Sequence, residues 1–345
     1  MYLSLNNRVK DFAELGKILQ SENGQKTLEK EVLHQYQLNP WFIPPFIWNA
    51  LEAIGKMLNE RDLQRLYAFY SNKKELIFEQ NCNVAVISAG NIPLAGFHDF
   101  FSVLFSGNRY VGKLSSQDHI LLPALANILI GIAPEYKNKI TFAEKLSSFD
   151  KIIATGSNNS ARYFDYYFGK YPHILRRNRN SIAVLSGNET DEELALLCQD
   201  IFLYFGLGCR SISKIFIPEN YNFRPLIEAI GKNGSIIADH HVYLNNLDYQ
   251  KTIHLMNQQP FLDAGCVMLM ESEFFSSPIS ILFYQYYHSL EEINNLIESS
   301  KEEIQCVVSN LKGVRNSVNL GKAQIPSLFD YADGMDTIEF LCTKL

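Results

Sequence analysis

A cysteine on a glycine-rich turn is the residue in this chain best suited to chemistry. Residues 205–214 read Phe-Gly-Leu-Gly-Cys-Arg-Ser-Ile-Ser-Lys, which places the thiol at Cys209. Glycines adopt backbone conformations that other residues avoid, and they let a substrate approach the chain closely. A helix-like pattern precedes this turn and an apolar strand-like run follows it. We therefore expect Cys209 to be displayed on the turn, where its thiolate can attack a carbonyl carbon.

The other five cysteines favour packing roles. Cys198 and Cys306 lie within apolar patterns, where a free thiol is commonly buried. Cys266 follows a glycine and is the rival nucleophile, ranked well behind Cys209. The chain has no C-x-x-C pair and no His or Cys spacing typical of a metal site. We expect free thiols in a reducing, cytoplasmic compartment and no bound metal.

Two polar residues ahead of the cysteine each follow or close an expected strand. Asn91, in the run Ser-Ala-Gly-Asn-Ile-Pro, comes after an apolar strand at 83–88. Its amide can donate to an oxyanion, although an asparagine before a helix more often acts as its N-cap. Lys113 closes the next strand, at 110–114, where a cofactor ribose or phosphate can bind.

A third loop, Thr155-Gly156-Ser157, follows the expected strand 151–154 and opens a helix. The first backbone N–H groups of a helix have no partner within it, so we expect them to face a pyrophosphate. The loop lacks the G-x-G-x-x-G dinucleotide fingerprint and the P-loop spacing. Alone it is therefore a weak signal.

Length and composition narrow the class of protein. The 345 residues suit two domains, and a net charge of -6 disfavours nucleic acid as a partner. No apolar run is long enough to predict a membrane span. Short apolar strands alternate with helices, which predicts parallel sheets covered on both faces. We place the N-terminal helices and a doubly wound dinucleotide-binding domain in 1–177, and a thiol-bearing catalytic domain in 178–345, whose C-terminal tail is free to return toward the first domain.

Taken in order, these motifs resemble the aldehyde dehydrogenase superfamily. The resemblance implies an α/β fold of two doubly wound domains with a largely helical N-terminal segment. It implies an oxyanion-hole amide at Asn91, a ribose-binding Lys113, a phosphate turn at 155–157 and a nucleophile at Cys209. Downstream, Glu273 and Phe275 resemble the family's Glu-x-Phe segment, which holds the nicotinamide ribose, although the residues that follow differ from the family pattern.

One residue that differs from the family pattern indicates which subgroup of the family this chain resembles. The general-base glutamate of the family's hydrolytic members falls on Leu175, which cannot activate water. The chain therefore most resembles Lux-type fatty acyl-CoA reductases, and its segment 320–337 is similar to the tail of their short bacterial members. This resemblance implies an acyl-Cys209 thioester that a nicotinamide cofactor reduces to an aldehyde after CoA has left. Ser116, neutral where an acidic residue would repel a 2′-phosphate, favours NADPH and permits NADH.

Several alternatives stay open at this point. A reductase of acyl phosphates or a semialdehyde dehydrogenase would use the same fold and cysteine. A silent binding or assembly protein would keep the fold alone, but the joint presence of Asn91, Lys113, Gly156 and Cys209 favours an enzyme. The family often dimerises, so a homodimer is expected, although no dimerisation arm is evident. Acyl chain length cannot be read from the sequence.

Overall fold

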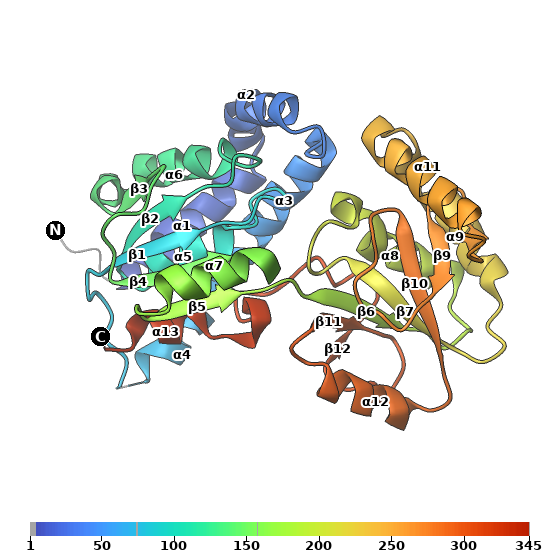
Figure 1. Ribbon diagram of the computed structural model, residues 1–345. Helices are drawn as coiled ribbons and strands as arrows, with labels where there is room; N and C mark the ends of the chain where they lie inside the picture. Colours follow the sequence, from blue (N-terminus) through green and yellow to red (C-terminus); the bar gives the residue numbers. More distant parts are fainter. Residues whose placement is uncertain (1–4, 74, 157, 345) are drawn as a thin grey trace. The chain divides into compact units, whose positions relative to one another are not determined.

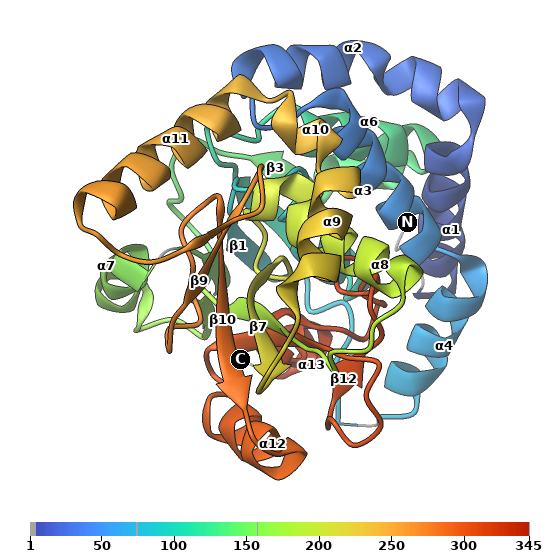
Figure 2. The ribbon, with the colours of Figure 1, turned by 90° about the vertical axis from the view of Figure 1, so that its right-hand side faces the viewer.

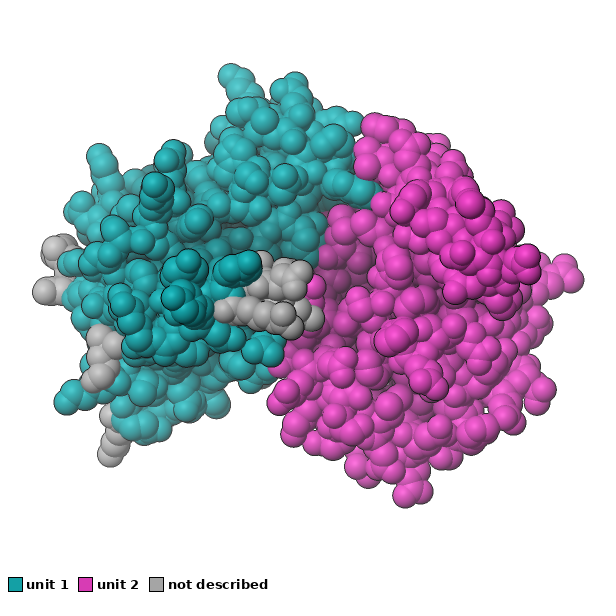
Figure 3. Space-filling model, in the orientation of Figure 1, with its two compact units in different colours: residues 1–177, 326–345 teal, residues 178–325 magenta. Residues whose placement is uncertain are grey.

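The computed structural model describes residues 5–73, 75–156 and 158–344. Two units make up the chain, and Figure 3 shows them in different colours: residues 1–177 with 326–345 form unit 1, and residues 178–325 form unit 2. The chain therefore leaves unit 1 after Arg177, and its C-terminal residues belong to unit 1 again.

Unit 1 is built on a five-stranded sheet whose described strands are all parallel, in the order β3-β2-β1-β4-β5 (Figure 1). The strands are β1 (Asn83–Ile87), β2 (Arg109–Lys113), β3 (Ile140–Phe142), β4 (Lys151–Thr155) and β5 (His173–Arg176). The direction of winding reverses between β1 and β4. Doubly wound sheets bind ligands at the carboxyl ends of their strands, at such a reversal.

Helices cover both faces of this sheet. Alternate residues of β1 point to opposite faces, so Val84 and Val86 join the large core with α5 and α6, while Ala85 packs on the side of α7. Burial on both faces explains why this strand is a continuous apolar run. The helices of unit 1 are α1 (Leu5–Gln20), α2 (Glu22–Leu38), α3 (Pro44–Met57), α4 (Glu60–Ser71), α5 (Phe97–Phe105), α6 (Leu121–Ile132), α7 (Asn158–Phe168) and α13 (Thr337–Cys342), with short 3-10 turns η1 (Pro134–Asn138) and η3 (Ala332–Gly334).

Unit 2 contains a seven-stranded sheet, in the order β12-β11-β6-β7-β10-β9-β8, in which only the short β8 runs antiparallel among the described strands. The strands are β6 (Asn180–Val184), β7 (Ile212–Pro218), β8 (Leu262–Asp263), β9 (Met268–Glu271), β10 (Ile281–Tyr287), β11 (Ile304–Val308) and β12 (Ser317–Val318). Its helical elements are α8 (Asp191–Phe202), η2 (Leu203–Gly206), α9 (Phe223–Asn233), α10 (Ser235–Ala238), α11 (His241–Met256) and α12 (Leu290–Ser299). Figures 1 and 2 show α12 on one side of this sheet and α8 and α9 on the other.

The predicted fold class is confirmed, with local differences from the sequence expectations. The loop after β1 is longer than the sequence analysis implied, because residues 93–96 form a turn and α5 begins only at Phe97. The sequence analysis did not predict β5, β10 or α11. Helix α11 buries only Tyr243 and Leu247 along its length, so its sequence carries little amphipathic signal.

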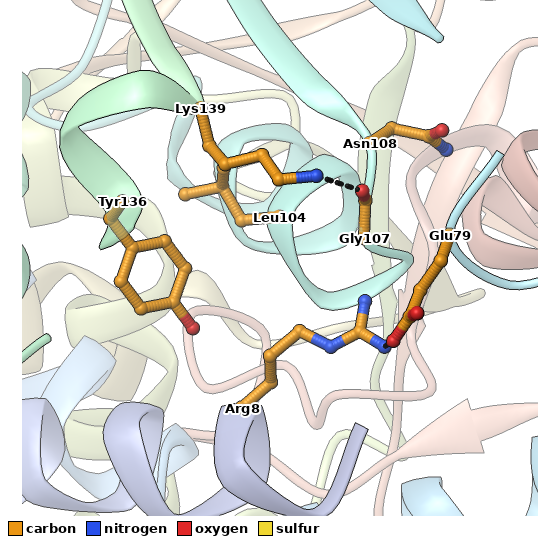
Figure 4. Close-up of a pocket in the computed structure, with 7 residues that line it drawn as sticks. All are labelled: Arg8, Glu79, Leu104, Gly107, Asn108, Tyr136 and Lys139. Carbon is orange, nitrogen blue, oxygen red and sulfur yellow. Dashed lines mark hydrogen bonds and ion pairs between the residues drawn. The ribbon is translucent and has the colours of Figure 1, made fainter. Parts of the chain in front are cut away.

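A buried arginine, Arg8 of α1, pairs with Glu79 in the segment that leads into β1 (Figure 4). The Arg8 side chain is 1% exposed and its Nη2 lies 3.0 Å from Glu79 Oε1. Lys139 Nζ donates beside it to the carbonyl of Gly107, at 2.8 Å. Gly107 has φ +84°, and a Cβ built on it would lie 2.3 Å from Arg8 Nη1. A glycine is therefore required here both by the backbone conformation and by the close approach of the guanidinium.

We expect Gly107→Ala to lower the free energy of unfolding by about 2–4 kcal/mol, because it combines a left-handed backbone with a side-chain clash. Gly131→Ala is the matched control. Gly131 lies in α6, and a Cβ there would meet nothing within 4 Å. The control should stabilise the protein by about 0.5–1 kcal/mol. Urea unfolding of both variants measures the difference, and equal stabilities would contradict this account.

Candidate active site

The predicted cofactor residues of unit 1 share the carboxyl edge of its sheet. The register pairs Ile87 of β1 with Lys113 on one side and with Ala154 on the other. Lys113, the last residue of β2, is exposed. Thr155 follows Ala154 at the end of β4, so these positions meet where the winding of the sheet reverses. This arrangement is the one that binds a dinucleotide in doubly wound folds.

Asn91 lies on the loop that leaves β1, and its side chain is exposed. The residue that caps α5 is Gly96, not Asn91. The interpretation of Asn91 as the N-cap of this helix is therefore wrong.

A buried carboxylate holds this loop. The Leu94 N–H donates to Asp118 Oδ2 at 2.7 Å, and Leu94 itself has φ +59°. A Cβ on Gly90 would lie 2.2 Å from Ser115 Oγ, so the Asn91 loop packs directly against the turn that carries Ser115 and Asp118. Asp118 is 6% exposed, and burial raises the pKa of its carboxyl to about 7. The sequence analysis missed Asp118, although it lies two residues after Ser116, which is exposed on the same turn.

The phosphate turn differs in one respect from the prediction. The Gly156 N–H donates to the carbonyl of Arg176 at 3.3 Å, extending the pairing of β4 with β5. This N–H is therefore used in the sheet, and the predicted phosphate contact is left to the first N–H groups of the helix that follows. Ser157 lies outside the described residues. The helix that begins at Asn158 directs its first backbone N–H groups toward the same edge, as the N-terminus of a helix does.

Cys209 differs from every other cysteine of the chain in its exposure. All six lie in the described part of the structure; Cys209 is exposed and the other five are buried. Burial raises the pKa of the Cys198 thiol to about 12 and also raises the pKa of the rival Cys266 thiol. A thiolate forms least readily at these buried positions, so the geometry favours Cys209 as the nucleophile.

The turn that carries Cys209 is anchored on both sides. Ser181 Oγ, from β6, donates to the carbonyl of Cys209 at 2.8 Å. The Ser211 N–H closes the turn onto the carbonyl of Gly208 at 3.0 Å. Gln324 donates to Ser211 Oγ at 3.1 Å, and β7 begins at the next residue. The thiol is thus held at a defined point of the sheet without being buried.

The backbone before the turn is strained. Tyr204, Phe205 and Gly206 have φ of 55°, 56° and 74°, which places three successive residues in the left-handed region. A non-glycine residue costs about 1–2 kcal/mol in this conformation. The buried ring of Phe205, whose centroid lies 4.2 Å from that of His240, offsets this cost by packing. Strain of this kind is concentrated at functional sites.

Arg210 follows the cysteine but binds elsewhere. Its Nε donates to the carbonyl of Ala323, and its Nη2 lies 3.8 Å from Cys306 Sγ. Asp200 accepts from the N–H groups of Gly321 and Ala323, at 2.6 and 3.1 Å. Arg210 and Asp200 therefore fix the segment at 321–323 against the cysteine turn.

The predicted ribose-binding segment lies in the same unit as the cysteine. Glu273 is exposed, whereas Phe275 is half-buried against the core that contains Ile182 and Phe216. Lys214 Nζ donates to the carbonyl of Glu273 at 2.8 Å, and Ser213 Oγ donates to the carbonyl of Phe275 at 2.7 Å. Both donors come from β7, directly after the cysteine turn. The sequence analysis did not identify either of them.

Leu175, at the position of the family's general base, is a packing residue. It lies in β5 opposite Ala154 and packs with Ile152 on the side of α7. The neighbouring Arg176 is buried and pairs with Asp99, Nη1 to Oδ2, at 2.6 Å. Among the described residues, no group of three or more His, Cys, Asp or Glu is arranged to hold a metal ion. None of the described helices is long and apolar enough to cross a membrane.

Solved structures of aldehyde dehydrogenases are similar to this chain. An oxidoreductase from Marinobacter aquaeolei has a TM-score of 0.63 at 11% identity, covering 95% of this chain and 80% of its own. Aldehyde dehydrogenase 21 from Physcomitrella patens, solved with succinate, has a TM-score of 0.62 at 12% identity, covering 90% and 74%. The AldA indole-3-acetaldehyde dehydrogenase from P. syringae, solved with NAD+ and IAA, has the same score and identity, covering 91% and 74%.

The chain has the aldehyde dehydrogenase fold. No protein-family model and no curated protein matches its sequence. At identities this low, the likeness establishes the architecture, and the chemistry has to be argued from the residues themselves. The neighbours' chains are longer than this one, since it covers 74–80% of each of the three.

We expect Cys209 to react first with iodoacetamide in the native protein, because the other five thiols are buried. Mass spectrometry of peptides after brief labelling measures the order, with urea-unfolded protein as the reference for complete labelling. Cys209→Ser should remove the fast phase. Labelling of Cys266 or Cys198 at the same rate would contradict the assignment.

Asp118→Asn should make stability less dependent on pH. With a folded pKa near 7 and a usual value of 3.8, Asp118 holds its proton in the folded protein and loses it on unfolding between these values. The stability that protonated Asp118 gives the folded protein is therefore complete at low pH and is lost as the pH rises through 7. At pH 8 we expect the variant to be more stable than the wild type by roughly 1–3 kcal/mol, with a smaller difference at pH 5. Thermal unfolding across this range measures it, and parallel pH profiles would contradict the buried-carboxylate account.

Proposed function

We propose that this protein is a nicotinamide-dependent acyl-CoA reductase, which converts an acyl thioester to an aldehyde through an acyl-Cys209 intermediate. The observation that carries the proposal is the single exposed thiol on a turn anchored by Ser181 and Ser211, within an aldehyde dehydrogenase fold. A thiol that is exposed and yet held by its backbone suits covalent catalysis.

The first step exchanges one thioester for another. The thiolate of Cys209 attacks the acyl carbonyl carbon, the bond to CoA sulfur breaks, and free CoA leaves with a proton. Because a thioester is both consumed and formed, the exchange is nearly balanced in energy. Catalysis then depends on stabilising the oxyanion. We assign this to the backbone N–H of Cys209, and loss of one such donor typically costs about 2.7–4 kcal/mol.

The residues present fit a nicotinamide cofactor, which when bound supplies the hydride that reduces the acyl group. Exposed Lys113 and Ser116 lie at the carboxyl edge of the unit 1 sheet, where an adenosine ribose and its phosphate bind in such folds. Exposed Glu273 suits hydroxyl groups of the second ribose. Ser116 places no negative charge near a 2′-phosphate, which supports NADPH and permits NADH. The reduced adduct then breaks its carbon–sulfur bond to give the aldehyde, and a proton taken up by the departing sulfur returns Cys209 to the thiol form.

Leu175 supports reduction over hydrolysis. A thioester on Cys209 is hydrolysed by water that a general base has activated. Leu175 packs beside Ala154 and offers no such base, so the acyl group is retained until it is reduced or passed back to a thiol. Acyl-phosphate and semialdehyde substrates share this chemistry and remain the alternatives that the assay has to separate.

The deciding experiment follows CoA release and cofactor oxidation separately. Without cofactor, wild-type protein mixed with acyl-CoA should release about one CoA per chain in a burst, and added NADPH should then give steady turnover to aldehyde. Cys209→Ala should lose both phases, while Cys266→Ala, at a buried thiol, should keep them. Acyl-CoAs of several chain lengths and an acyl phosphate are compared as substrates.

A burst that survives in Cys209→Ala would refute the nucleophile. Turnover with an acyl phosphate but with no acyl-CoA would instead identify the protein as an acyl-phosphate reductase. No burst with either substrate, in protein that is folded by circular dichroism, would favour a silent protein of the same fold.

A further inference from the structure

Lys214 is a charged side chain in the interior of unit 2. The residue is 0% exposed and lies on β7, five positions after Cys209. Its ammonium donates to Gln285 Oε1 of β10 at 2.6 Å and to the carbonyl of Glu273 at 2.8 Å. The rings of Phe216 and Phe275 lie 4.9 and 5.1 Å from the same nitrogen. An ammonium is buried only where acceptors replace its water, and here the two acceptors lie on two separate segments, β10 and the loop after β9.

The contacts of Lys214 reach a segment that is joined to the sheet by backbone pairing only at its first residue, where the Ser272 N–H donates to the carbonyl of Tyr284 at 3.0 Å. Residues 272–276 follow the end of β9 and form neither helix nor strand. Among the side chains of β7, Lys214 holds the carbonyl of Glu273 and Ser213 holds the carbonyl of Phe275. The backbone on each side of exposed Phe274 is therefore tied to the strand that begins just after the cysteine turn.

The positive charge of Lys214 strengthens its hydrogen bond to the carbonyl of Glu273. Burial lowers the pKa of Lys214 to about 8, and the carboxylate of Glu273 acts in the opposite direction. A charged donor forms a stronger hydrogen bond to a carbonyl than a neutral one. A methionine of similar length would fill the same space without any donor.

We infer that Lys214 is a positioning residue, whose ammonium fixes the Glu273–Phe275 segment relative to β7, the strand that follows the Cys209 turn. The inference rests on the proposed function, since it gives that segment the role of holding the nicotinamide ribose. Within unit 2, the nucleophile and the ribose contact then belong to one rigid framework, joined through β7. A change at Lys214 alters cofactor binding without touching cofactor, substrate or thiol.

The test compares Lys214→Met with Lys151→Met. Lys151 is the matched control in unit 1: it is 2% exposed and its ammonium donates to the carbonyls of Phe340, Leu341 and Thr343. Both variants remove a buried ammonium that holds carbonyls, so both are expected to lower the melting temperature. Only Lys214→Met should weaken equilibrium binding of NADPH, by about tenfold, as measured by cofactor fluorescence. The cofactor-free CoA burst should persist in both.

Lys214→Arg keeps a donor and should recover part of the NADPH affinity, which a loss through general destabilisation would not show. Wild-type affinity in Lys214→Met, or an equal loss in Lys151→Met, would overturn the inference. Hydrogen exchange of residues 272–276 gives a readout that does not depend on activity. Exchange there should accelerate in Lys214→Met, and unchanged exchange would also overturn the inference.

A wild-type protein that binds neither NADPH nor NADH would refute the proposed function and, with it, the cofactor role of Lys214. Hydrogen exchange would still decide whether Lys214 holds this segment. The two failures are therefore distinguished by separate measurements.

Discussion

The hydrogen bond from Ser181 to the carbonyl of Cys209 is the constraint on which the site in unit 2 depends. Ser181 is itself buried in β6, so the cysteine turn is fixed to the middle of the sheet. The strained residues Tyr204 and Phe205 hold the chain on one side, and β7 continues it on the other. A thiol can then remain in solvent while its backbone stays fixed, which is the pre-organisation that covalent catalysis requires.

Buried polar groups also hold parts of the backbone in place in unit 1. Asp118 replaces the missing regular pairing of the Asn91 loop with one strong hydrogen bond to Leu94. Arg176 and Asp99 join β5 to α5, and Thr337 links the same guanidinium to the C-terminal helix at 2.9 Å. Each of these groups contacts a proposed functional loop or lies next to one in the sequence. Burying charge is costly, so such groups are retained where they fix the position of something else.

The strands and helices that the sequence predicted well are those with strong local patterns. Residues 83–87 form the apolar strand expected at 83–88, because both faces of β1 are covered, and β4 begins at Lys151 as expected. Strand β5 was missed because its four residues include a histidine and an arginine, and the Asp99 that pairs with Arg176 lies 77 positions away in the sequence. The arginines near residue 177 read as one basic run, yet Arg176 is buried and paired while Arg177 is exposed.

The chemistry of the candidate site was also readable in part from the sequence. Gly-x-Gly-Cys and the strand-to-loop positions of Asn91, Lys113 and Glu273 are local features, set by residue type and order. The fold could therefore be inferred before any coordinates, whereas the lack of a catalytic base at Leu175 stays a prediction. Residues that act through distant contacts could not, because their partners lie far along the chain: 24 positions separate Leu94 from Asp118, and 59 separate Lys214 from Glu273. Only the tertiary structure decided that Cys209 is exposed while Cys266 is buried, since burial depends on which elements pack over a residue and not on its neighbours in sequence.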